Sequence, residues 1–461
     1  MSLLNVGVSA LLTSQNSLST VSHNISNVNT EGYSRQRTEQ GTQKPNFQGG
    51  YYVGSGVTTT DITRRFDNFL VSQVRGFTSQ ESEQNTFLSY SKQVDDLLGD
   101  PNIGLNSGME AFFNTVQSVS NDPTSIPARQ VMLSQGELLA NRFNTLDQQL
   151  RDFDKQIDSQ IVVAVDTVNS LSRGIANLNN AIVAATSQSG GKPNDLMDQR
   201  DLLITQLAEF TTVTTSNQGD GSINVFVGTG QALVTGSQSV DLKVIPDTSV
   251  SPQRNSIGFG VAGIDITSQL TGGSIGGAFQ VRSKVLDTAR TDLNKLAFDF
   301  VDKFNTQHQL GIDLDGNAGG LFFGDLSSTP ASDYAATISV AISDTRKIAA
   351  SSTTNPAVGN NENALALANL QTKKTTTSVG SFSDSYGVLV ANVAARTHQA
   401  DINKKTQEGL LNQTKLKFDS IVGVNLDEEA ANLIKFQQSY QAASQIITVS
   451  NTVFNALINA V

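Results

Sequence analysis

The stretch FQQSYQAASQIITVSNTVFNALINAV, residues 436–461, contains no Asp, Glu, Lys or Arg. Apolar residues nevertheless recur there every seven positions, in a row that begins earlier: Leu426, Leu433, Tyr440, Ile447, Phe454 and Val461. Residues 1–30 are equally free of charge and carry a similar row: Leu4, Leu11, Leu18 and Ile25. A seven-residue apolar spacing predicts helices that pack against other helices along one stripe.

The outer positions of these two helices hold Ser, Thr, Asn and Gln. A helix that faces water usually carries Lys and Glu there. An uncharged helix can be surrounded by protein on every side, because its burial removes no ion from water. Because Ser, Thr and Asn are mediocre helix formers, we expect helix formation at both ends to be coupled to assembly. We therefore predict that both ends are buried together in a polymer of subunits.

An ordinary two-helix coiled coil within the monomer is the alternative. Its flanking positions would usually carry the Glu and Lys that set register, and these are missing here. The residues expected at the assembly interface are the apolar members of both rows and of the row beside the C-terminal one: Leu4, Leu11, Leu18, Ile25, Leu426, Leu433, Phe436, Tyr440, Ile447, Phe454 and Leu457.

Length and composition exclude several classes of protein. A chain of 461 residues is too long for one core and should form two to four domains. Its net charge of −11 argues against nucleic acid and anionic membranes as partners. The absence of Cys excludes disulfides and thiol chemistry, and the three His residues lack metal-ligand spacing. No apolar run reaches about 18 residues, so no membrane span is expected, and the start lacks the basic region of a cleavable signal peptide.

The periodicity of apolar residues predicts a mainly α fold with β-rich inserts. One predicted helix, residues 127–186, would be roughly 90 Å long, which is typical of a rod or coiled coil. A polar, Gly-rich stretch over 33–60 should form an extended loop or hairpin. The other expected elements are helices over 3–28, 62–98, 109–119, 194–210, 285–304, 382–422 and 426–461, and strand-like segments over 211–270 and 311–372.

We expect an elongated multi-domain rod whose N- and C-terminal helices pair as a coiled-coil-like inner domain, because the chain leaves and returns alongside itself. The predicted domains are an inner, tube-forming domain (1–33 and 425–461), a helical bundle (34–210, 271–310 and 373–424), a β-rich insert (211–270) and a short β-rich outer segment (311–372).

A glycine pattern, GFGVAG at residues 258–263, matches the dinucleotide-binding fingerprint. That fingerprint needs a following helix to direct amide groups at a pyrophosphate. The next residues, Ile-Asp-Ile-Thr, indicate a strand instead. We therefore interpret the pattern as a glycine-rich β-turn and expect no cofactor.

Asp313, Asp315 and Asn317 have the spacing that opens a calcium loop. Ala318 stands where the loop needs Gly, and Gly324 where it needs a bidentate Glu. A polar hairpin turn is the better interpretation, and no metal site is expected.

No set of residues suggests catalysis. His23, His308 and His398 are isolated in the sequence, and acidic pairs such as Glu428 and Glu429 are most simply solvated charges. The Arg64-Arg65 pair likewise needs only solvent. We therefore predict that the chain is not an enzyme.

Four segments resemble the bacterial flagellar axial proteins, the family of rod, hook and hook-associated proteins. The hook-associated members are the most similar. The resemblance covers both ends and most of the helical framework but is weak over 211–270 and 311–372. The segments are NISNVNTEGYSRQ (24–36), GKPNDLMDQRD (191–201), VNLDEEAANLI with FQQSYQAASQ (424–434 and 436–445), and NALIN (455–459).

This resemblance implies a structural adaptor in the junction layer between hook and filament. The terminal helices would form the innermost tube around the export channel. The protein would be secreted uncleaved by flagellar type III export and be extracellular. The implied partners are further copies in a ring-like homo-oligomer, the hook protein, a second hook-associated junction protein, and a cytoplasmic export chaperone on the C-terminal helix.

Three other functions stay open from the sequence. The chain could be another axial protein, such as a hook, distal rod or second junction protein. A secreted enzyme such as a wall hydrolase would need an acid pair that the sequence does not suggest. A helical secreted effector or adhesin should work as a monomer with ordered termini.

Overall fold

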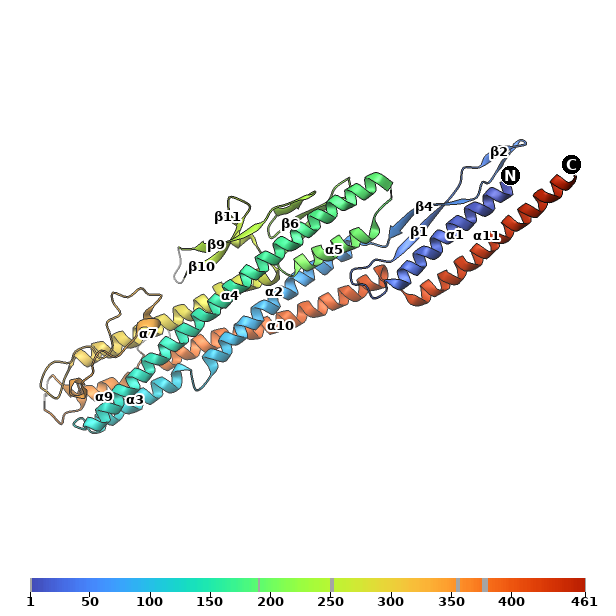
Figure 1. Cartoon of the computed structure of the whole chain (residues 1–461). Coiled ribbons are helices and arrows are strands. Elements are labelled where there is room, and N and C mark those ends of the chain that lie inside the picture. Colours follow the sequence, from blue (N-terminus) through green and yellow to red (C-terminus); the bar gives the residue numbers. More distant parts are fainter. Residues whose placement is uncertain (1, 190, 249–252, 354–356, 375–379, 461) are drawn as a thin grey trace.

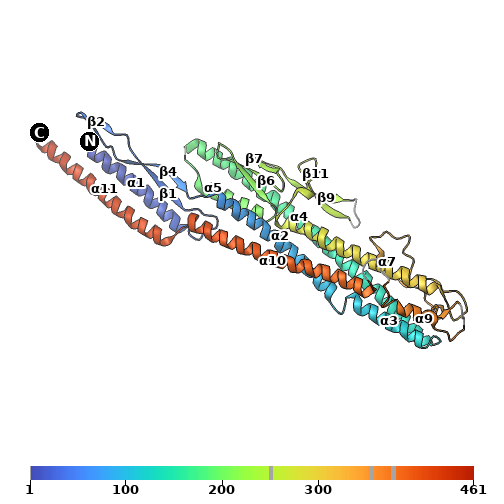
Figure 2. The same cartoon turned by 180° about the vertical axis from the view of Figure 1, so that it is seen from behind.

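The computed structural model describes residues 2–189, 191–248, 253–353, 357–374 and 380–460. Long helices run side by side and give the protein the shape of an extended rod (Figure 1). The first helix begins and the last helix ends at the same end of the rod, beside a β-hairpin (Figures 1 and 2). The predicted class, mainly α with β-rich inserts and paired terminal helices, is confirmed.

Helices make up most of the described chain. A π-helical turn, Arg282–Leu286, joins α6 to α7. The helices are α1 (Ser2–Ser26), α2 (Asn68–Gly99), α3 (Leu105–Asn121), α4 (Ile126–Ser189), α5 (Asn194–Ala208), α6 (Gly273–Val281), α7 (Asp287–Gln309), α8 (Tyr334–Thr337), α9 (Glu362–Asn369), α10 (Phe382–Val422) and α11 (Leu426–Ala460).

The strands form small antiparallel sheets. They are β1 (Gln36–Thr42), β2 (Asn46–Gln48), β3 (Tyr51–Val53), β4 (Val57–Arg64), β5 (Val213–Asn217), β6 (Ile223–Val227), β7 (Gln231–Thr235), β8 (Gln238–Ser239), β9 (Leu242–Asp247), β10 (Arg254–Phe259), β11 (Ile264–Asp265), β12 (Gly311–Ile312) and β13 (Ser351–Ser352). Strands β1 and β4 pair in a long hairpin that β2 and β3 extend. The insert contains the sheets β5-β6-β7-β8 and β11-β10-β9.

The rod is built on α4, which has 64 residues and is therefore about 96 Å long. Apolar residues spaced seven apart on this helix are buried, including Leu139 with Leu146, and Phe143 with Leu150 and Ile157. The helix packs against α3, α5 and α7. The predicted long helix is confirmed, with bounds of Ile126–Ser189 instead of 127–186.

A cluster of phenylalanines fills the part of the core between α3, α7 and the chain after β12. Phe112, Phe300, Phe304, Phe322 and Phe323 have no solvent exposure. Their ring centroids lie 4.9–6.1 Å apart in tilted, edge-on and stacked pairs. Such pairs add to the free energy gained from burying the rings.

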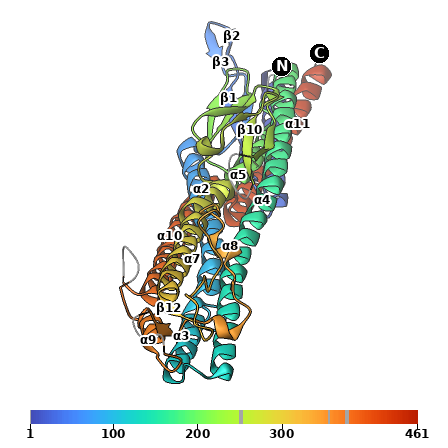
Figure 3. The same ribbon diagram turned by 90° about the vertical axis from the view of Figure 1, so that its left-hand side faces the viewer.

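Buried asparagines attach the β-rich insert to α4. The side-chain amide of Asn169 donates to Leu242 O (2.9 Å) and accepts from Leu242 N–H (2.7 Å). Asn179 makes the same pair of bonds with Ile223 (2.8 and 3.1 Å). Each amide thus replaces a strand neighbour, and the insert lies along α4 (Figure 3).

Two predicted helix starts were wrong. The helix predicted from Ile62 begins at Asn68, because residues 57–64 form β4 and Ile62 pairs with Thr38 of β1. The run VTTTDIT is rich in β-branched residues, which favour strand. Asp67 then caps α2 by accepting from the N–H groups of Phe69 and Leu70. The helical region predicted from Val285 begins earlier, at Gly273.

The strand-like character predicted for 311–372 was also wrong. Only the two-residue strands β12 and β13 occur in its described part, together with α8, α9 and irregular chain. Side chains from α7 provide the hydrogen bonds that a sheet would otherwise provide. Asn305 Oδ1 accepts from the N–H groups of Phe322 and Phe323 (3.0 and 2.9 Å), and His308 Nε2 accepts from Ala349 N–H (3.0 Å).

Substitution of a core phenylalanine tests this packing. Phe300→Ala should lower the free energy of unfolding by about 3–5 kcal/mol, because it removes a buried ring and leaves a cavity. Phe69→Ala is the matched control, because that ring is 65% exposed, and should cost less than about 0.5 kcal/mol. Urea unfolding followed by circular dichroism measures both. Equal effects of the two substitutions would contradict the placement of the core.

Candidate assembly interface

The terminal helices α1 and α11 cross closely through small residues. A Cβ on Gly7 would lie 2.9 Å from Cγ1 of Ile447. Ser14 and Val21, which follow Gly7 at intervals of seven, are buried, and so is Ala443 on α11. The row of α1 that faces α11 is therefore the one that contains Gly7, because small residues let two helix backbones approach. We call this contact between α1 and α11 the seam.

Among the residues predicted for the assembly interface, Ile447 packs against Gly7 within the subunit. None of them is fully buried in the subunit. Leu11, Leu18, Ile25, Leu433, Phe436 and Ile447 are half-buried, whereas Leu4, Leu426, Tyr440, Phe454 and Leu457 are exposed. Their apolar side chains thus stay available for contacts with other chains, and their packing between subunits stays a prediction.

Most of α11 is uncovered. Its buried residues are only Glu429 and Ala443, and residues 451–460 are all exposed. Val449, Val453, Phe454, Leu457 and Ile458 are each more than half exposed. Contiguous exposed apolar side chains usually mark a surface that binds another protein.

A network of polar side chains, here called the polar joint, fastens the terminal helices to the rod. Arg35 Nε donates to Glu429 Oε1 (2.6 Å), and Arg35 N–H donates to Val422 O at the end of α10 (2.9 Å). Asn24 Nδ2 donates to Glu429 Oε2 (3.2 Å) and to Gln36 O (2.9 Å), and Asn24 Oδ1 accepts from Gln36 N–H (2.9 Å). The end of α1, the start of β1 and the start of α11 are thereby tied together.

Helix α5 completes the polar joint from the other side. Asp198 accepts from Ser34 N–H (2.8 Å) and from Arg64 Nη1 (2.6 Å). Arg64 also donates to Asp201 Oδ2 (2.6 Å), and Gln36 Nε2 donates to Asp195 Oδ1 (2.6 Å). The carboxylates of α5 thus anchor the base of the hairpin.

Burial perturbs the titratable groups of the polar joint. It raises the pKa of Tyr33, which the nearby carboxylates of Asp195 and Asp198 raise further. Burial also raises the pKa of Asp198, although its hydrogen bond with Arg64 opposes the shift. On the same helix, burial lowers the pKa of Arg200 to about 10. With this pKa, Arg200 stays charged at neutral pH. Its guanidinium donates to Asn179 Oδ1 and Gly221 O (3.1 and 2.8 Å).

The polar joint corrects two interpretations from the sequence. Glu429 is only 1% exposed and is paired with Arg35, so it is not the solvated charge that we expected. Arg64 is also enclosed, in ion pairs with Asp198 and Asp201. Sequence reasoning missed both as functional residues. The available signal was the family resemblance of the segments that contain or contact these residues. Three of the four segments, 24–36, 191–201 and 424–434, meet at the polar joint.

The other patterns have structural roles. In the glycine pattern, Gly258 and Phe259 end β10 and residues 260–263 form the turn to β11, where Gly260 and Gly263 have φ angles of 68° and 61°. Asp313 Oδ1 accepts from the N–H groups of Asp315 and Asn317 (2.9 Å each), so the predicted polar turn is confirmed. His23, the titratable group of α1, lies 3.3 Å from Asp195.

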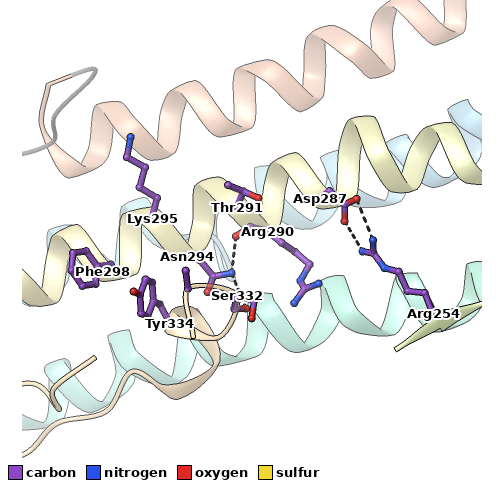
Figure 4. Close-up of a pocket in the computed structure, with 10 residues that line it drawn as sticks. Arg254, Asp287, Arg290, Thr291, Asn294, Lys295, Phe298, Ser332 and Tyr334 are labelled. Atoms are coloured by element: carbon purple, nitrogen blue, oxygen red, sulfur yellow. Dashed lines mark hydrogen bonds and ion pairs between the residues drawn. The ribbon is translucent and has the colours of Figure 1, made fainter. Parts of the chain in front are cut away.

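A cavity of about 550 Å³ lies between α7 and the chain around Ser332 (Figure 4). Its two arginines face carboxylates of neighbouring elements. Arg254 contacts Asp287 (2.5 Å) and Asp154 (2.7 Å), and Arg290 Nε lies 3.6 Å from Asp147 Oδ1. Such pairing fits a role in holding β10, α4 and α7 together.

The described ranges contain no group of three or more His, Cys, Asp or Glu residues that is arranged to hold a metal ion. No helix within them combines the length and apolarity needed to cross a bilayer.

Three family profiles match the chain and define its class, a subunit of a flagellar axial structure. The profile "Flagella basal body rod protein" matches residues 4–33, and "Flagellar basal body rod FlgEFG protein C-terminal" matches 417–460. The profile "Flagellar hook-associated protein FlgK helical domain" matches 91–323.

Relatives with similar sequences identify the family. Flagellar hook-associated protein 1 of Escherichia coli K12 is 32% identical over 99% of both chains, and that of Bacillus subtilis 168 is 27% identical over 98% of this chain and 96% of its own. The chain belongs to the flagellar hook-associated protein 1 family. The fold is similar to that of the flagellar hook junction protein FlgK from Burkholderia pseudomallei, with a TM-score of 0.69 and 20% identity over 76% of this chain and all of that one.

Substitution of Arg35 tests the polar joint. Arg35→Ala leaves the buried Glu429 carboxylate without its cation and should destabilise the docking of α11 by about 3–5 kcal/mol. Amide exchange over residues 426–436 should accelerate accordingly. The control Arg37→Ala removes an exposed pair with Glu39, which should contribute at most about 1 kcal/mol.

The double variant Arg35→Met/Glu429→Leu should recover most of the protection, because it removes both charges together. If Arg35→Ala and Arg37→Ala exchanged at the same rate in α11, the polar joint would not hold this helix.

Proposed function

We propose that this protein is a structural adaptor of the bacterial flagellum that forms the junction layer between hook and filament. It polymerises through its terminal helices. The observation that carries the proposal is the exposed, uncharged and apolar surface of α1 and the second half of α11 at one end of the rod. Membership of the hook-associated family supports the same function.

Assembly would complete the burial that a single subunit leaves unfinished. Full burial of one Leu or Phe side chain contributes on the order of 1.5–3 kcal/mol. The apolar residues beside the seam of α1 and α11 are half-buried or exposed in one subunit, and contacts between copies would cover them. This gain adds to the contacts within the subunit that oppose the conformational entropy lost when both ends are ordered.

The proposed partners follow from this surface and from the family. They are further copies in a ring-like homo-oligomer, the hook protein and a second hook-associated junction protein. Before secretion, a cytoplasmic export chaperone would cover the apolar side chains of α11. The proposed location is outside the cell, at the hook–filament junction, after type III export.

The proposed division into domains follows the sequence-based one. Residues 1–33 and 425–461 form the inner, tube-forming domain, and 34–210, 271–310 and 373–424 form the helical rod. Residues 211–270 and 311–372 form two attachments on the rod. The polar joint lies between the inner domain and the rod.

We also propose that the protein has no catalytic role. The buried carboxylates Asp147, Asp154 and Asp198 all lie in ion pairs with arginines, which supports a structural role for them. A wall-digestion assay with the purified chain should give no activity above that of the buffer.

Complementation tests the proposed function. A flagellated strain that lacks its own first junction protein should form hooks without filaments and release filament protein into the medium. Expression of this chain in that strain should restore attached filaments, visible by electron microscopy. Full secretion of the chain without any attached filament would refute the proposal.

Truncation tests the role of the terminal helices. Deletion of residues 1–26 or of 436–461 should leave a folded, soluble rod, because the core is formed by α2, α3, α4, α7 and α10. Neither truncated chain should restore filament attachment. Circular dichroism checks the fold, and electron microscopy of the complemented strain checks incorporation. A truncated chain that joins the hook as well as the full chain does would show that the helices are dispensable.

A further inference from the structure

The tip of the hairpin beside α1 exposes three aromatic rings. Phe47, Tyr51 and Tyr52 are 65%, 78% and 76% exposed. Phe47 and Tyr52 pair across β2 and β3, with ring centroids 5.1 Å apart. We call these three residues the aromatic tip. Exposed aromatic side chains of this kind are enriched where proteins bind one another.

The chain around the aromatic tip carries almost no charge. Between residues 43 and 56, Lys44 is the sole charged residue. At the base of the hairpin, by contrast, charges are frequent, as at Arg37, Glu39 and Asp61. The aromatic tip therefore continues the uncharged surface of α1 and the second half of α11. Strands of three residues are marginally stable without packing, so the tip also gains from being covered.

The aromatic tip lies level with the last turns of α11. Gly56 contacts α1 at Val6 and Ser9, and Gly7 of the same turn contacts Ile447 of α11. The five residues from Gly56 to Tyr51 span at most about 17 Å. A helix covers that length in about eleven residues, so Tyr51 lies no further along α11 than the level of Ile458.

The β2–β3 end of the hairpin and α11 lie on opposite sides of α1 (Figures 1 and 2). Subunits placed side by side around a common axis would therefore bring the tip of one copy to the α11 of the next. At that level, α11 presents Val453, Phe454 and Leu457, each more than half exposed. Both surfaces are apolar, and their contact would bury no charge.

We propose that the aromatic tip packs on residues 453–458 of α11 in the neighbouring copy of this chain. The inference rests on the proposed polymerisation through the terminal helices and specifies which surfaces meet. The contact is heterologous, since each copy offers its tip to one neighbour and its α11 to another. Repetition of such a contact produces a ring or a helix of subunits.

Disulfide trapping tests the contact, because the chain has no Cys of its own. Two differently tagged chains, one Tyr51→Cys and the other Leu457→Cys, are co-expressed in the strain that lacks its junction protein. Hooks with attached filaments are isolated and oxidised. A disulfide-linked dimer that carries both tags is expected, and it can form only between copies. The control pair is Val261→Cys with Leu457→Cys, since Val261 is 94% exposed on the distant β10–β11 turn, and it should form no such dimer.

Three outcomes would overturn the contact: no dimer with both tags although both chains are incorporated, dimers of Tyr51→Cys with itself only, or equal dimers in the control pair. Failure of the unsubstituted chain to restore filaments would instead refute the proposed function. The two failures are therefore distinguishable.

A second variant tests whether the contact matters. Phe47→Ser/Tyr51→Ser/Tyr52→Ser should be secreted and folded but should lose most attached filaments, with filament protein in the medium. Val261→Ser is the matched control and should attach filaments normally. Normal attachment with the triple variant would overturn the proposal. If the triple variant is not secreted, the disulfide experiment alone decides.

Discussion

The organisation of this protein depends on the cost of removing a charge from water. Buried charges are tolerated where each has a partner, as with Arg35 and Glu429 in the polar joint. Away from the joint, α1 and the second half of α11 carry no charge, so other chains can cover them without that cost. The terminal helices are thus fixed at one end by an ion pair and free to bind along their length.

The helical framework could be predicted because its signal is local. The seven-residue rows of α4 lie within one element, and Gly423 separates α10 from α11 as expected. The irregular chain after β12 could not be predicted, because distant side chains such as Asn305 and His308 replace its strand partners. The start of α2 was missed since Ile62 suits both a helical row and the alternation of β4.

The polar joint was beyond prediction for a different reason. Arg35 and Glu429 are far apart in the sequence, and neither neighbourhood shows which of two adjacent glutamates is buried. The exposed residues of α11 present the converse case. Their apolar spacing was recognisable, yet the inward seam runs through Gly7 and Ala443, whose small size gives no hydrophobic signal.

After α1 the chain returns along that helix in the β1–β4 hairpin, so it passes into the rod at residues 65–67 and leaves the rod at Gly423. The two crossings lie side by side, because Arg65 N–H donates to Arg35 O and Arg35 N–H donates to Val422 O. Two adjacent tethers resist torsion about the long axis better than one tether would, while they leave an easy direction of flexure across the line that joins them. The joint can therefore transmit torque and still accommodate a change in tilt between the inner helices and the body of the rod.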